Sequence, residues 1–237
     1  MAEITPIVFI VDNDISVRES LELLVRCAGF QPEAFASAQA FLSYPRTNVP
    51  SCLVLDVALP GLNGLWLQQH LTATRSEIPI IFVTSCNDVA ITVQAMKAGA
   101  QEFLTKPFDD EVLSNAIRHA IERSQAALGR DAQTQALRAR YASLTTRERQ
   151  VMALVVSGLL NKQVGSELGI SEITVKAHRG RVMLKMQAGS LPDLVKMATR
   201  LRIAPGIAIQ PRNDPSLPTK QRVTPDFFGL SSGHYLQ

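Results

Sequence analysis

The sequence has 237 residues, of which 46% are hydrophobic and 19% charged, and its formal net charge is +3 at pH 7. This length suits one large domain or two small ones, and the absence of internal repeats and low-complexity tracts excludes a repeat protein. No apolar run is long enough to span a membrane, and three cysteines cannot all pair and lack metal-ligand spacing. We therefore expect a cytoplasmic protein with free thiols and no membrane association.

The charge is divided unevenly along the chain. Residues 1–125 carry 8 basic and 14 acidic side chains, whereas residues 126–203 carry 13 basic and 5 acidic ones. The overall charge therefore conceals an acidic half joined to a basic half. A basic module of this size is typical of a protein that binds a polyanion, although a solvated basic surface would have the same composition.

The first apolar run, residues 7–11, ends at Asp12, Asn13 and Asp14. Such a run predicts a buried strand with polar groups at its carboxyl end. Ser16 and Glu19 then have the spacing of a capping box, which predicts the start of a helix. That helix ends before Gly29, and a weaker strand over 31–35 and a short helix over 38–44 follow.

The next strand, residues 52–56, is apolar up to a single carboxylate, Asp56. Turn residues follow it, since Pro60 and two glycines lie within the next eight positions. In open sheets of parallel strands, sites lie beyond the carboxyl ends of the strands, so Asp56 is a site candidate. The alternative is that Asp56 only caps the helix that follows.

Three further segments complete an alternating pattern. We expect helices over 65–73 and 89–98, a strand over 78–83 that ends before Thr84 and Ser85, and a last strand over 102–104 shortly before Lys106. Five strands that alternate with helices predict an α/β doubly wound parallel sheet.

In such a sheet, the ends of the first, third, fourth and fifth strands meet at one edge. They bring together the side chains of Asp12, Asn13, Asp56, Thr84 and Lys106. Hard oxygen ligands suit Mg²⁺, and a lysine can balance the charge on phosphoryl oxygens. Asp56 could then attack a phosphoryl group and form an aspartyl phosphate.

The motifs of this half resemble the receiver domain of two-component response regulators. They are VDND at 11–14, LDVALPGLNG at 55–64, VTS at 83–85, AMKAGA at 95–100 and FLTKPF at 103–108. The resemblance implies a flavodoxin-like fold and phosphotransfer from a cognate sensor histidine kinase to Asp56. It also implies Mg²⁺ near Asp12, residue 13, Asp56 and the Ala58 carbonyl, and a phosphate-binding switch that uses Thr84, Ser85, Lys106 and Phe103.

One residue departs from the family pattern. The family usually has a second acid at the position of Asn13, and that acid commonly binds the metal. An amide oxygen brings no charge, so we expect weaker Mg²⁺ binding and slower phosphorylation.

From Asp109 the pattern is helical as far as residue 142. An apolar stripe ends near residue 121, and a polar stretch rich in Ala, Gln and Arg follows. We expect a receiver domain over 1–124 and a helical linker over 125–142, with or without a break near Gly129. A coiled coil is possible, but the heptads are poor.

The basic module, residues 143–203, has the pattern of an all-α domain of four helices. Thr145 or Thr146 with Glu148 predicts the start of a helix through Val156. Helices over 161–168 and 171–186, joined at Gly169, match a helix-turn-helix, and a fourth helix is expected over 194–201. Residues 144–186 resemble the DNA-binding domain of the LuxR, FixJ and NarL regulators.

This resemblance implies a recognition helix that enters the major groove of double-stranded promoter DNA. The family motif places Lys176, Ala177 and Gly180 at base-facing positions, with Arg179 and Arg181 as further readers of bases. Phosphate contacts are expected from Asn161, Lys162, Thr174, His178 and Lys185. Alternatively, the residues expected to contact phosphates form a generic basic surface.

The two halves together predict a phosphorylation-controlled transcription regulator that dimerises, binds promoters and activates, in contact with RNA polymerase. We expect no enzymatic activity beyond self-phosphorylation and autodephosphorylation at Asp56. One rival is a phosphorylation-independent DNA-binding regulator, which Asn13 favours. Another is an Mg²⁺-dependent phosphotransferase or phosphatase acting on a different substrate. Residues 204–237, rich in proline, are expected to form a disordered tail.

Overall fold

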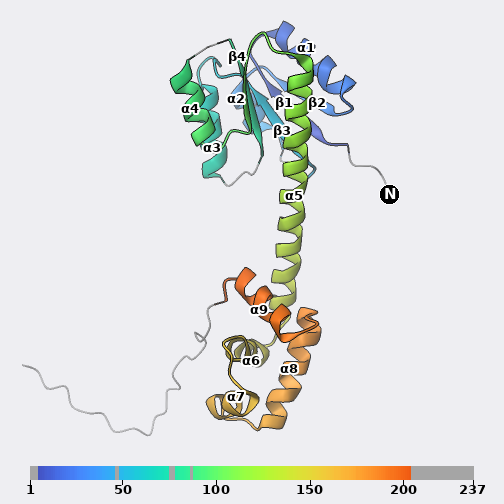
Figure 1. The fold of residues 1–237 in the computed structure, drawn as a ribbon, viewed down its shortest axis with the longest axis vertical. Coiled ribbons are helices and arrows are strands. Elements are labelled where there is room, and N and C mark those ends of the chain that lie inside the picture. The colour runs from blue at the N-terminus through green and yellow to red at the C-terminus, as the bar shows by residue number, and fades with distance from the viewer. Residues whose placement is uncertain (1–4, 46–47, 75–77, 86–87, 204–237) are drawn as a thin grey trace, which may run out of the picture.

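The computed structural model describes residues 5–45, 48–74, 78–85 and 88–203. In these ranges the chain forms five strands and nine helices, which are arranged as a larger α/β domain and a smaller helical domain at opposite ends of one long helix, α5 (Figure 1). The strands are β1 (Ile7–Val11), β2 (Gln31–Phe35), β3 (Ser51–Leu55), β4 (Ile80–Thr84) and β5 (Glu102–Thr105). The helices are α1 (Ile15–Cys27), α2 (Ala38–Ser43), α3 (Gly64–Ala73), α4 (Val89–Lys97), α5 (Asp110–Ala142), α6 (Thr146–Val156), α7 (Asn161–Leu168), α8 (Glu172–Met186) and α9 (Leu191–Arg200).

The five strands form one parallel sheet in the order β2-β1-β3-β4-β5. Strands β1, β3 and β4 are buried along their whole length, which explains why they are continuous apolar runs rather than alternating ones. The predicted doubly wound five-stranded sheet is therefore confirmed. The order reverses between β1 and β3, and this is the point at which ligands bind in such sheets.

Helices cover both faces of the sheet. Helices α1 and α5 pack on one face, where their buried residues share a core with alternate residues of β1, β3 and β4. Helices α2, α3 and α4 pack on the other face around a second core, which includes Phe9, Leu55 and Phe82. The alternation of the strands thus supplies a separate apolar layer to each set of helices.

The start of α1 differs from the sequence expectation. Asp14, not Ser16, is the N-cap residue, because its carboxylate accepts a hydrogen bond from the Ser16 amide at 2.9 Å. The Ser16 hydroxyl donates to the same carboxylate. The Ser16–Glu19 capping box is therefore wrong: a carboxylate two residues upstream already satisfies the free amide at the helix start.

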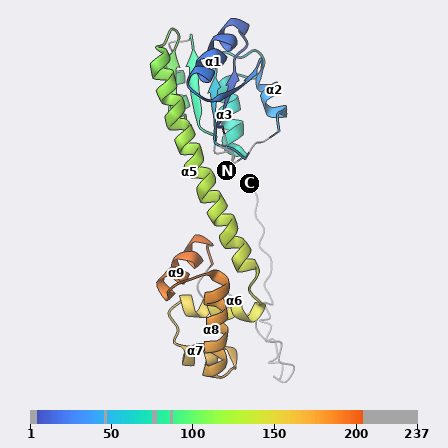
Figure 2. The same ribbon diagram turned by 90° about the vertical axis from the view of Figure 1, so that its right-hand side faces the viewer.

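Helix α5 is continuous over 33 residues, so the chain does not break at Gly129. Its first part packs on the sheet, and near its end Leu137 and Tyr141 pack into a core of the helical domain. Figure 2 shows the helix from a second side, where it again joins the two domains without interruption. The stretch predicted as a linker therefore contributes side chains to the domain that follows it.

In the helical domain, α6 to α9 surround two connected cores. The capping box at its start is formed by Thr145 and Glu148, as predicted for one of the two threonines. Helix α9 begins at Leu191, three residues earlier than expected, because Ser190 caps it and Pro192 suits its first turn. None of the helices in the described part of the chain has both the length and the apolar character of a membrane span.

Candidate phosphoacceptor site and nucleic-acid interface

Asp12 and Asp56 follow directly on two neighbouring strands. Val11 and Leu55, the last residues of β1 and β3, are register partners, so the two carboxylates leave the sheet side by side. Both residues are almost completely buried, with 2% and 8% of their surface exposed. Two buried carboxylates close together repel each other, and a nearby positive charge reduces this repulsion.

Lys106, which follows β5, supplies that charge. Its Nζ atom lies 2.7 Å from Oδ2 of Asp12 and 4.0 Å from Oδ2 of Asp56. The chain separation between Lys106 and Asp12 is 94 residues, so only the closed sheet brings them together. The sequence prediction of an acid and lysine cluster at this edge is therefore confirmed for these three side chains.

Backbone amides fix the orientation of both carboxylates. Oδ1 of Asp12 accepts a hydrogen bond from the Asp14 amide at 2.9 Å, and Oδ1 of Asp56 accepts one from the Ala58 amide at 3.2 Å. At the first residue of α3, a Cβ atom on Gly64 would collide with the backbone carbonyl of Asp56. Glycine at this position therefore lets the start of α3 approach the end of β3 closely.

The remaining predicted residues lie around this pair. Thr84 is fully buried at the end of β4, and its carbonyl accepts a hydrogen bond from the Lys106 amide at 2.8 Å. Ser85 and Asn13 are exposed next to the site. Phe103 in β5 is half-buried and packs against Phe82, with 5.9 Å between ring centroids.

The donor set fits a magnesium ion better than a softer metal. The carboxylates of Asp12 and Asp56 lie together here and are the hard oxygen ligands that Mg²⁺ prefers, and the resemblance adds the Asn13 amide and the Ala58 carbonyl as expected ligands. In the described part of the chain, no group of three or more His, Cys, Asp or Glu side chains could hold a metal. A metal held here would therefore keep several waters, as Mg²⁺ ordinarily does.

Asp14 does not replace the acid that is absent at position 13. Hydrogen bonds from the hydroxyl and amide of Ser16 hold the pKa of the Asp14 carboxyl below its ordinary value. This carboxylate is exposed and used as the cap of α1. Among the described residues, the charged side chains at the site itself are thus two acids and one lysine.

Two cysteines lie in the described part of the chain, and both are free thiols. Burial raises the pKa of the Cys52 thiol to about 12, so it stays protonated and serves as an apolar core residue. Cys86, which lies close to the site in the sequence, is outside the described residues.

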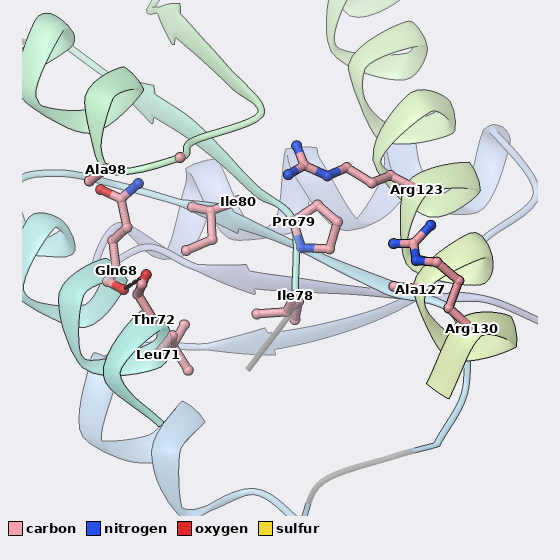
Figure 3. A pocket seen from close by; sticks show the side chains of 11 residues that line it. Gln68, Leu71, Thr72, Ile78, Pro79, Ile80, Ala98, Arg123, Ala127 and Arg130 are labelled. Atoms are coloured by element: carbon pink, nitrogen blue, oxygen red, sulfur yellow. Dashed lines mark hydrogen bonds between the residues drawn. The ribbon is translucent and has the colours of Figure 1, made fainter. Parts of the chain in front are cut away.

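A pocket at the opposite edge of the sheet is separate from this site. It has a volume of about 420 Å³ and is lined by Pro79 and Ile80 at the start of β4, whereas Thr84 marks the end of that strand. Figure 3 shows Gln68 of α3 on one side of it and Arg123 and Arg130 of α5 on the other. Its lining residues take no part in the cluster around Asp56.

The helical domain contains the predicted helix-turn-helix. Helices α7 and α8 are joined at Gly169, whose positive φ of 65° ends α7 in the left-handed conformation that glycine adopts most easily. Close packing then requires Gly165, because a Cβ atom there would lie 2.7 Å from the carbonyl oxygen of Ile170. Val175, Val182 and Met186 anchor α8 in the core.

Some of the residues predicted to contact DNA are exposed, and others form contacts with side chains of the same domain. Lys162, Ala177, Gly180 and Arg181 are exposed, and Lys176 is exposed although it forms an ion pair with Glu172 at 3.2 Å. The Thr174 hydroxyl lies 2.8 Å from that of Ser171, and Arg179 donates to Asn161 at 3.2 Å. His178 is half-buried.

Lys185 is placed differently from the expectation of a phosphate contact. Its Nζ atom lies 2.7 Å from Oε2 of Glu148 in α6, a residue that is 2% exposed. It also donates to the carbonyl of Ser143 at 3.3 Å. Lys185 therefore stabilises the packing of α8 against α6. The sequence pattern indicates only a capping role for Glu148, so it does not predict this ion pair.

Comparisons with known proteins identify the family of both domains. Residues 8–118 match the family model for the response regulator receiver domain, and residues 142–198 match that for bacterial regulatory proteins of the luxR family. Nodulation protein W of Bradyrhizobium diazoefficiens is 48% identical over 198 residues, which cover 84% of this chain and 87% of the relative. Transcriptional regulatory protein FixJ of the same organism is 42% identical over 193 residues, covering 81% and 94%.

A solved structure of the response regulator StyR has the same arrangement of elements. It aligns with a TM-score of 0.73 and 46% identity, over 83% of this chain and 99% of that chain.

Proposed function

Because the chain belongs to the two-component response regulators that join a receiver to a LuxR-type DNA-binding domain, we propose that phosphorylation of Asp56 controls its binding to promoter DNA. The observation that supports this most directly is the position of Lys106, whose Nζ atom contacts Asp12 and lies 4.0 Å from Oδ2 of Asp56. A structural acid at a strand end needs no such buried cation. A carboxylate that must accept a phosphoryl group does, because negative charge accumulates there during transfer.

The phosphoryl group comes from a phosphohistidine of a sensor kinase. An Asp56 oxygen forms a bond to phosphorus while the bond between phosphorus and the histidine nitrogen breaks, and the histidine leaves. Asp12, Asn13 and the Ala58 carbonyl would hold Mg²⁺, which supplies positive charge to the phosphoryl oxygens. Lys106 gives further positive charge, and the Thr84 hydroxyl donates a hydrogen bond to the product.

The output follows from a shift between conformers. Phosphorylation can act only by favouring the conformer that exposes the dimer or DNA surface. Two copies of the helical domain on one DNA duplex double the phosphate contacts, so a modest shift gives a large change in occupancy. We propose that the result is activation of transcription through RNA polymerase.

The intact mass of the full-length protein tests the proposal. The protein is incubated with a small-molecule phosphodonor, with Mg²⁺ and separately with a chelator, alongside Asp56→Asn. We expect a gain of one phosphoryl group that requires Mg²⁺ and is absent from the variant. No gain at any Mg²⁺ concentration would favour the phosphorylation-independent regulator, whereas turnover of a small phosphoester would favour a phosphotransferase acting on another substrate.

A further inference from the structure

The outward face of the recognition helix α8 has an apolar centre. Its inward face is formed by Val175, Val182 and Met186, all at most 1% exposed. At 100° per residue, the row on the opposite side of the helix consists of Ile173, Ala177, Gly180 and Leu184. The two aliphatic side chains of this row, Ile173 and Leu184, are 80% and 78% exposed.

Cations border this row on both sides. The exposed Lys176 lies on one side of it and the exposed Arg181 on the other. A basic domain that keeps its charges at the edges of a helix face and apolar groups at the centre is complementary to a polyanion whose charges flank an apolar surface. Duplex DNA has this arrangement, since its phosphates border the major groove and the thymine methyl group lies inside it.

Gly180 indicates that another molecule approaches this face closely. It lies inside a 15-residue helix, where glycine costs about 1 kcal/mol relative to alanine. A Cβ atom added there would meet nothing within 4 Å, so packing inside the described chain does not require glycine. Without a side chain at this position, a partner can approach the backbone of α8 closely.

We infer that Ile173 and Ala177 contact the 5-methyl groups of thymines in the major groove, and that this contact contributes to the choice of target sequence. The inference rests on the proposed DNA binding and specifies how the target is read. Ile173 lies in the first turn of α8, the half of a recognition helix that reaches base edges. Among the outward residues, Lys176 and Arg181 then read polar base edges, and Ile173 and Ala177 read thymine.

Leu184 provides a matched control. It is as exposed as Ile173 and lies on the same row, but it is 11 residues further on, about 16 Å along the helix axis. It therefore lies outside the part of α8 that enters the groove. Loss of an exposed aliphatic side chain is the same change at both positions, and only the loss at Ile173 should alter base readout.

The test begins with selection of bound duplexes from a random DNA pool by the full-length protein, with and without phosphodonor. Each thymine of a selected duplex is then replaced by deoxyuridine, which removes only the methyl group. Burial of one such group corresponds to about a fourfold change in affinity. We expect a loss of that size at one or two positions of each half-site.

In Ile173→Ala, deoxyuridine should no longer weaken binding at the position that Ile173 contacts, whereas Leu184→Ala should show the same loss as the unaltered protein. Affinity for random duplex should be unchanged in Leu184→Ala. If sequences are selected but deoxyuridine is harmless at every position, or its effect is unchanged in Ile173→Ala, the inference is wrong and the DNA-binding function stands. If no sequence is selected under either condition, both are wrong.

Discussion

Asn13 is the residue at which this receiver differs chemically from its family. It is exposed next to Asp12, and among the described residues the other acid at the site is Asp56. Lys106 already forms an ion pair with Asp12, so the described residues leave about one net negative charge to attract a divalent cation. Mg²⁺ gives up its waters reluctantly, and each lost ligand charge lowers its affinity.

Asn13→Asp should therefore lower the Mg²⁺ concentration that half-maximal phosphorylation requires, by about tenfold if the added charge gains 1.4 kcal/mol of interaction free energy. The measurement is the initial rate of phosphoryl incorporation against Mg²⁺ concentration. Asp14→Asn is the control, because asparagine also caps helices and the change removes a nearby charge whose carboxylate is used as the cap of α1. An unchanged Mg²⁺ requirement in Asn13→Asp would show that the Asn13 amide does not weaken Mg²⁺ binding.

Sequence reasoning correctly located the residues whose position is set by where a strand ends. Asp12, Asp56 and Lys106 follow strands, and strand ends can be read from apolar runs. It failed for residues whose partners lie on another element. Nothing near Lys185 in the sequence indicates Glu148, 37 positions away, and nothing near Arg179 indicates Asn161.

At the scale of elements, the ion pair of Lys185 and Glu148 joins α8 to α6. The Glu148 carboxylate also accepts the Thr145 amide at 2.8 Å, so one buried group holds the start of α6 and the end of α8 together. Removal of one partner of a buried ion pair lowers the free energy of unfolding by more than the intact pair contributes to it, because the other partner stays desolvated.

Lys185→Ala should lower the free energy of unfolding of the helical domain by about 1–3 kcal/mol. Urea denaturation of the full-length protein, followed by a signal from the helical domain, measures the change. Lys176→Ala is the matched control: it also removes a lysine of α8 from an ion pair, but that pair is exposed and should contribute less than about 0.5 kcal/mol. Equal effects of the two variants would contradict the structural role of Lys185.

The same ion pair predicts a pH dependence. The hydrogen bond from Lys185, and then that from the Thr145 amide, lower the pKa of Glu148 from its ordinary 4.5. Since the folded-state pKa is lower than the unfolded one, this stabilisation is complete above pH 4.5 and is lost as the pH falls through the lowered value. Glu148→Gln should therefore lose less stability than the unaltered protein when thermal unfolding is compared at pH 6 and pH 3. An identical loss in both proteins would contradict this assignment.

The observed element boundaries show which of them can be predicted from sequence patterns. Strands β1 and β2 agree with the predicted ranges because apolar residues and turn residues bound them sharply. Helix α9 begins three residues before its predicted start because Ser190 caps it and Pro192 suits its first turn. The sequence alone does not decide whether the helix continues through Gly129, since one glycine costs a helix about 1 kcal/mol and only the packing at both ends of α5 outweighs this cost.

At the scale of the whole molecule, α5 is the element that both domains share. It packs on the sheet at one end and supplies Leu137 and Tyr141 to the helical domain at the other (Figure 1). Arg140 also donates to the carbonyl of Met186 at the end of α8. A helix built into both cores fixes the rotation of one domain relative to the other, which a flexible linker cannot do.

Insertions between the exposed residues Asp131 and Ala132 should separate the effect of the rotation between the two domains from the effect of the distance between them. Two added helical residues turn the helical domain by about 200°, whereas seven turn it by about 700°, or nearly two full turns, and lengthen α5 by about 10 Å. We expect the seven-residue variant to keep the phosphorylation-dependent gain in DNA affinity and the two-residue variant to lose it. Basal DNA binding should be similar in both, because the helix-turn-helix is untouched.

The measurement is the ratio of DNA affinities with and without phosphodonor for each variant, with phosphoryl incorporation checked by intact mass. A continuous helix transmits orientation as well as position, and orientation decides whether two DNA-binding domains can contact one duplex together. If the two-residue variant kept the full gain, α5 would act only as a tether, and the signal would have to pass through the dimer contact alone.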